Sequence, residues 1–157
     1  CASVVIWLLI LIVVALDLEQ EKENLFVFCC SCPLLPISWL IGKVLKVDIF
    51  DKSNPLGNVG FLFTCNQFLY LLIVMWVFRA VPDKIVMVYA MVFGAHLLPY
   101  SWLYKSLSYR SFAIAIPIIS LIVGCIFPAF SVAVTMLIIE VIFVISLLVE
   151  IRRFMKK

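Results

Sequence analysis

The sequence predicts an all-α bundle of transmembrane helices. Of its 157 residues, 66% are hydrophobic, and the mean hydropathy is +1.25. A soluble domain is about half apolar, so this excess exceeds what one buried core needs and indicates a chain solvated by lipid. Charged residues make up only 13% of the chain and fall mainly between the apolar runs. We therefore expect a single integral membrane domain over residues 1–157, with the lipid bilayer as its main partner.

Six apolar runs predict about six spans. A helix rises ~1.5 Å per residue, so crossing a hydrocarbon core of ~30 Å takes about 20 residues. The runs cover residues 2–16, 25–47, 61–78, 85–104, 112–128 and 131–151. The first run is the shortest and no Met precedes it, so we expect a span that is truncated at its N-terminus. A signal-peptide remnant and a lipidated Cys1 are the alternatives.

The basic residues predict how the chain is threaded. Lys and Arg in short loops stay on the cytoplasmic side of a membrane. Nine of the 12 basic residues fall on the side shared by the second and fourth connections and the C-terminal tail. The other three are Lys22, Arg79 and Lys84. Both termini are therefore expected in the cytoplasm of a cell-membrane protein. The net charge of +3 is too small and too scattered for a nucleic-acid surface.

Prolines predict where helices break, because proline lacks a backbone donor and clashes with the preceding turn. Pro128 is expected to separate the last two spans. Pro33 and Pro36 are expected to kink the second span early. Pro55, in the stretch NPLG, predicts a turn. Pro99 cannot donate to the carbonyl group four residues before it, so the fourth span should be weakened beside the single histidine of the chain, His96.

Four polar residues within the spans are the candidate site residues. They are Glu140 in the sixth span, His96 in the fourth, and Asn66 and Gln67 in the third. The predicted threading places Glu140 ~14 Å and the other three ~17 Å from the outer surface. Because titratable groups in a membrane usually face protein or water, this shared level predicts a hydrated cavity that binds or relays a proton, ion or polar solute. The alternative is that these groups hold helices together by hydrogen bonds.

Cysteines offer a second candidate chemistry. Cys29 and Cys32 have the CxxC spacing of redox motifs. The threading places them in the first turns of the second span, where a helix N-terminus would stabilise a thiolate. Packing is the alternative, since cysteine behaves as a small hydrophobe. We expect no metal site, because the histidine lies on another span. No phosphate loop or nucleophile elbow occurs, so neither a cofactor nor a catalytic residue is expected.

Several stretches resemble an uncharacterised family of small bacterial multi-pass membrane proteins. They read PLLPISWLIGKVL, NPLGN, NQFLY and GAHLLPYSWLYKSLSY. The resemblance covers about residues 25–110. It implies a protein of the bacterial inner membrane with an N-terminal extension beyond this chain, and it implies no activity.

Three functions are compatible with these patterns. The first is a small transporter or permease-like protein with Glu140 and His96 at its polar centre, acting on an unidentified ion or small molecule. The second is a non-catalytic membrane sensor, immunity or assembly partner. The third is a membrane thiol oxidoreductase that uses Cys29 and Cys32. The first two, which involve no enzyme activity, are favoured. Six spans make a small unit, so a homo-oligomer is plausible.

Overall fold

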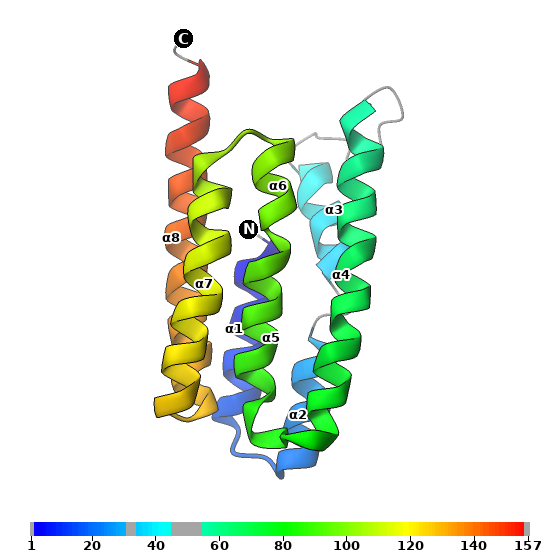
Figure 1. Ribbon diagram of the computed structural model, residues 1–157, viewed down its shortest axis with the longest axis vertical. Coiled ribbons are helices and arrows are strands. Elements are labelled where there is room, and N and C mark those ends of the chain that lie inside the picture. The colour runs from blue at the N-terminus through cyan, green and yellow to red at the C-terminus, as the bar shows by residue number, and fades with distance from the viewer. Residues whose placement is uncertain (1, 31–33, 45–54, 156–157) are drawn as a thin grey trace.

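A computed structural model describes residues 2–30, 34–44 and 55–155 of the chain (Figure 1). Within these ranges every regular element is a helix, which confirms the predicted all-α class. The elements are α1 (Ala2–Ala15), α2 (Gln20–Cys29), α3 (Leu34–Val44), α4 (Pro55–Ala80), the 3-10 helix η1 (Pro82–Lys84), α5 (Ile85–His96), α6 (Leu98–Leu103), α7 (Leu107–Ile126) and α8 (Ala129–Met155).

The helices run up and down along one common direction (Figure 1). The α1–α2 connection, η1 and the α7–α8 turn lie at one end of the bundle, here called the lower end. The α6–α7 connection and the C-terminal end of α8 lie at the opposite, upper end. α5 packs against α7 and α4, and α8 packs against α1 and α7. α5 thus lies between α4 and α8.

Over the described residues, three helical segments are long and apolar enough to cross a membrane. They are Pro82–Leu103, Leu107–Ile126 and Ala129–Met155. Ala2–Ala15 and Leu69–Ala80 are apolar but shorter. Large apolar side chains also cover the outside of the bundle, for example Leu72 on α4 and Ile122 on α7. Soluble monomers rarely expose apolar surface on that scale, so this exterior suits lipid. The number of six spans remains a prediction.

The proline-rich segments agree in part with the sequence. The fourth predicted span breaks at Leu97, between α5 and α6, because Pro99 cannot donate to the carbonyl of Ala95. The second predicted span is divided between α2 and α3. Pro36 lies in the first turn of α3, and Pro33 lies outside the described residues. The turn predicted at Pro55 is wrong, because Pro55 is the first residue of α4, a position that tolerates proline.

Small residues allow α5 and α7 to approach closely. A Cβ atom at Gly94 would lie 2.5 Å from Cγ2 of Ile116 and 2.6 Å from Cδ of Pro117. A Cβ atom at Gly124 would clash in the same way with Met87. These glycines therefore determine the distance between the two helices.

Charged side chains hold both ends of α7. At its N-terminus the carboxylate of Glu150, from α8, accepts hydrogen bonds from the backbone N–H of Leu107 at 2.9 Å and from Oγ of Ser106 at 2.8 Å. At its C-terminal end Nζ of Lys84 donates to the carbonyl of Gly124 at 3.0 Å. Each charge is opposite in sign to the helix dipole at that end, so both contacts stabilise α7.

Candidate functional site

Glu140 lies inside the bundle, at the contact between α8 and α1. Its side chain is 0% exposed. Oγ of Ser3, in the first turn of α1, donates a hydrogen bond to its Oε2 at 2.5 Å. An ionisable group on an apolar helix that faces a neighbouring helix rather than lipid is the arrangement expected of intramembrane carboxyls.

A second feature of this contact is a pair of unsatisfied polar atoms. Among the described residues, Oε1 of Glu140 and Nε1 of Trp7 are buried side-chain atoms without a hydrogen-bond partner. The Trp7 indole packs on Tyr89 and Phe93 of α5, with ring centroids 5.6 and 6.0 Å away. Leaving a buried polar atom unsatisfied costs about 1–3 kcal/mol. Two such atoms on packed helices therefore mark the α1–α8 contact as a candidate binding site.

His96 is the last residue of α5, directly before the break. Its side chain is buried, and its ring contacts Phe93 and Tyr100 with centroids 5.2 and 5.9 Å away. Nδ1 lies within hydrogen-bond distance of the carbonyl of Phe93. A carbonyl only accepts, so Nδ1 carries the hydrogen and Nε2 is the proton acceptor of the ring.

Aromatic rings lie between His96 and the helix that carries Glu140. The Tyr100 ring, which contacts His96, lies 6.0 Å from Tyr109, and Tyr109 lies 5.1 Å from Phe143. Phe143 follows Glu140 by about one turn of α8. In the described part of the chain, no hydrogen bond or ion pair joins His96 directly to Glu140. His96 thus contacts an aromatic cluster that reaches α8 at Phe143, about one turn from Glu140.

Asn66 and Gln67 lie on α4, which packs against α5 and α6. The Asn66 side chain is half-buried, and the Gln67 side chain lies outside what the structure describes. α5 contacts both α4, which carries Asn66, and α8, which carries Glu140.

The predicted redox pair is described only in part. Cys29 is exposed and free, and Cys32 lies outside the described residues. The expectation that Cys29 would lie near a helix N-terminus is wrong. α2 begins at Gln20, so Cys29 is its last residue, at the end of the helix dipole that disfavours a thiolate.

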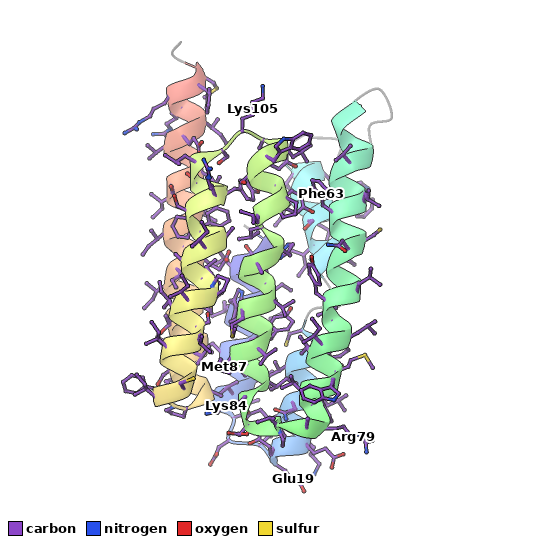
Figure 2. All side chains as sticks on the ribbon, in the orientation of Figure 1. Glu19, Phe63, Arg79, Lys84, Met87 and Lys105 are labelled. Carbon is purple, nitrogen blue, oxygen red and sulfur yellow. The ribbon has the colours of Figure 1, made fainter. Side chains whose placement is uncertain are left out.

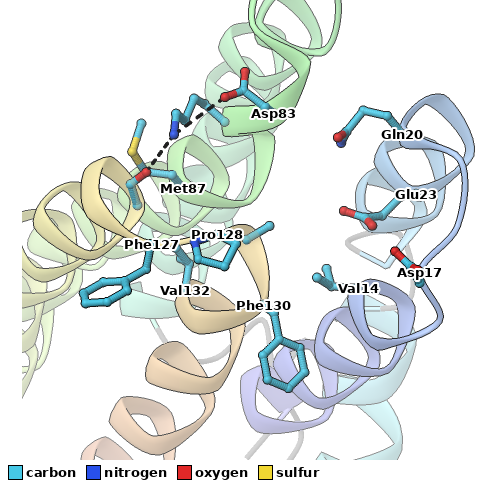
Figure 3. Close-up of a pocket in the computed structure, with 13 residues that line it drawn as sticks. Val14, Asp17, Gln20, Glu23, Asp83, Met87, Phe127, Pro128, Phe130 and Val132 are labelled. Carbon is cyan, nitrogen blue, oxygen red and sulfur yellow. Dashed lines mark hydrogen bonds and ion pairs between the residues drawn. The ribbon is translucent and has the colours of Figure 1, made fainter.

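Sequence reasoning missed a pocket at the lower end (Figure 3). It has a volume of about 360 Å³ and combines an apolar floor with charged walls. Asp17 and Glu23 come from the α1–α2 side, and Asp83 and Lys84 come from η1. Nζ of Lys84 lies 3.6 Å from the Asp83 carboxylate. Burial raises the pKa of Glu23 above its usual 4.5, and the nearby charge of Asp17 raises it further.

A buried asparagine ties the two sides of this pocket together. Asn24 on α2 is 0% exposed, and its Nδ2 donates to the carbonyl of Pro82 at 2.8 Å. Nε2 of Gln20 donates to Oδ1 of Asn24 at 2.9 Å. Both amides lie between the first two apolar runs of the sequence, and nothing in that polar stretch indicates that Asn24 is buried.

The described part of the chain has three helices that could cross a membrane and a carboxyl buried between two helices. Both features are consistent with a membrane protein. The chain belongs to the family of unknown function DUF7010, which matches residues 1–150. This supports the predicted resemblance to an uncharacterised family and extends it beyond residues 25–110. Neither the curated proteins nor the solved structures contain a match to the chain. Over the described residues, no three His, Cys, Asp or Glu side chains are grouped to hold a metal ion.

Proposed function

We propose that the chain is a transporter-like membrane protein with about six spans, in which Glu140 binds and releases a proton as an ion or polar solute crosses the membrane. The observation that carries this proposal is the complete burial of Glu140 with a single hydroxyl donor, Ser3. An unpaired carboxylate in an apolar interior is costly, so such a group is retained where it has a task. His96 is the second proton-binding group of the proposed pathway.

The charges at the two ends support cytoplasmic termini. The upper end carries the basic residues Lys105, Arg152 and Arg153 (Figure 2). The lower end carries Glu19, Arg79 and Lys84 (Figure 2), and the α1–α2 segment there is predominantly acidic. Because basic residues remain in the cytoplasm, the upper end is assigned to that side.

Proton flux tests the proposal. Purified protein is placed in liposomes that enclose a pH-sensitive dye, and a pH gradient is applied. We expect the gradient to decay several-fold faster than in protein-free liposomes, and Glu140→Gln to return the rate to the protein-free level. Glu21→Gln is the matched control, because that carboxyl is exposed at the lower end. Equal rates for wild type and protein-free liposomes would refute a proton pathway.

A non-catalytic sensor, immunity or assembly partner is the second candidate. It is favoured by hydrogen bonds that join helices and need no ligand, such as Ser108 to Ser146 between α7 and α8 at 2.8 Å. If Glu140→Gln changes neither flux nor any cellular phenotype, and another protein co-purifies with the chain, this candidate replaces the first.

The thiol oxidoreductase is the third candidate, and it rests on the CxxC spacing alone. Its test is the double substitution of Cys29 and Cys32 by serine. A thiol redox state in the cell envelope that is identical in the wild type and the double variant excludes this candidate.

A further inference from the structure

The two unsatisfied atoms of the α1–α8 contact have complementary chemistry. The indole Nε1–H of Trp7 can only donate a hydrogen bond, and an ionised Oε1 of Glu140 can only accept one. Ser3, which already donates to Oε2, precedes Trp7 by four residues on the same helix. Residues at this spacing lie on one face of a helix, so Trp7 lies on the face of α1 that carries Ser3, and its ring also packs on α5.

We propose that Trp7 is the second donor to Glu140 and that α1 forms a neutral cradle for the ionised carboxylate, with Ser3 on Oε2 and Trp7 on Oε1. The structure has no direct hydrogen bond between these two atoms, so the proposed link runs from the indole N–H to Oε1 through one water molecule. This inference rests on the proposed function in one respect, which is that Glu140 must ionise. The ligand of the Glu140 carboxylate is then a proton rather than a metal cation.

The donor set explains this choice of ligand. Hard cations take six or more oxygen ligands, whereas the described polar contact of the Glu140 carboxylate is one hydroxyl, with the indole N–H of Trp7 as the proposed second donor. An N–H donor turns the positive end of its dipole toward the site, so it favours a negative carboxylate and opposes a cation. α1 carries no charged side chain, so the side-chain donors that it offers to the negative charge are uncharged.

Other titratable groups lie near Glu140, and a pH titration of Trp7 must distinguish their effect from that of Glu140. On α5 these are His96 and Tyr89, and on α7 the nearest is Tyr109, whose phenol is close enough to interact electrostatically with Glu140. Their titration could reach Trp7 without involving Glu140.

Trp7 itself supplies the signal for the test. The chain has four tryptophans, and the other three, Trp39, Trp76 and Trp102, are 41%, 67% and 74% exposed. Replacing those three by phenylalanine leaves Trp7 as the single emitter. In nanodiscs, the emission of Trp7 and the infrared carbonyl band of the protonated carboxyl are followed against pH. We expect both to change with one midpoint, both to be lost in Glu140→Gln, and both to persist in His96→Asn.

Removing the donor gives an independent readout. In Trp7→Phe, the infrared midpoint should move to higher pH by about one unit, a tenfold change in proton affinity, because the ionised form has lost a partner. If the carboxyl band titrates but the emission of Trp7 stays constant, the inference is overturned while the proposed function stands. This outcome needs no substitution at the buried Trp7. If the carboxyl band never titrates, the proposed function fails, and the inference fails with it.

Discussion

The hydroxyl of Ser3 donates a hydrogen bond to Oε2 of Glu140, and the two residues are 137 positions apart in the chain. This contact joins α1 to α8. It also gives a polar partner to a carboxyl that is fully buried. The stability of the bundle and the proposed chemistry therefore depend on the same pair of residues.

Replacing Ser3 by alanine should destabilise the protein. The substitution leaves Oε2 of Glu140 without its donor, and we expect a loss of about 1–2 kcal/mol in the free energy of unfolding. Unfolding in mixed micelles, followed by circular dichroism, measures it. Ser111→Ala is the control, because that side chain is exposed on α7. Equal losses for the two variants would mean that the Ser3–Glu140 hydrogen bond contributes nothing to stability.

Alanine at either close-packed glycine should also destabilise the bundle. A methyl group at Gly94 would press on Ile116 and Pro117, and one at Gly124 would press on Met87, which forces α5 and α7 apart. We expect a cost of about 1–3 kcal/mol for each substitution. The control is Gly60→Ala, whose Cβ would meet Leu103 Cδ2 at an ordinary 3.5 Å. The prediction is wrong if Gly60→Ala costs as much as the other two.

Removing the Glu150 carboxylate should loosen the start of α7. Glu150→Ala deletes the acceptor for the backbone N–H groups of Leu107 and Ser108. We expect amide hydrogen exchange to rise in the first turn of α7, with a loss of about 1 kcal/mol, since exposed caps are worth that much. Glu150→Gln keeps an acceptor oxygen and should show an intermediate effect. Unchanged exchange at Leu107 in the alanine variant would contradict the cap.

Stability should depend on pH through Glu23. Its pKa is raised above 4.5 in the folded protein, by burial first and by Asp17 second, so folding favours the protonated form. The stabilisation from this group is complete below pH 4.5 and is lost as the pH rises through the raised pKa. Glu23→Gln should therefore match the wild type in melting temperature near pH 4 and exceed it at pH 7.5. Glu21→Gln, exposed on the same helix, is the control. A constant difference at both pH values would rule out this linkage.

The regular elements were largely predictable because they depend on local chemistry. Apolar runs form helices in a lipid environment, and prolines interrupt them, as at Leu97 beside Pro99. Pro55 shows the limit of such rules, because the same residue that begins a turn also begins a helix, as it does in α4. The start of α2 at Gln20 was not predicted, because the polar stretch QEKEN is typical of a loop. The structure shows that Asn24 in this stretch donates a hydrogen bond to the carbonyl of Pro82.

The sequence identified the residues of the candidate site, but it did not identify the side chains that they contact. Glu140 and His96 stood out because ionisable groups are costly in an apolar span. Their surroundings depend on which helices pack together. The carboxyl faces Ser3 and α1, whereas the imidazole packs on Phe93 and Tyr100. Nothing in the spacing along the chain pairs Ser3 with Glu140, because their distance in sequence carries no information on packing.

Hydrophobic composition alone determined that this chain is helical and suited to lipid, since a backbone in hydrocarbon must satisfy its hydrogen bonds within each helix. Only the tertiary structure decided which side chain each buried polar group meets. That choice depends on the order of helices around α5 and on the glycines that set their separation. Hydrogen-bond partners such as Ser3 and Glu140 come from different helices and are brought together by folding.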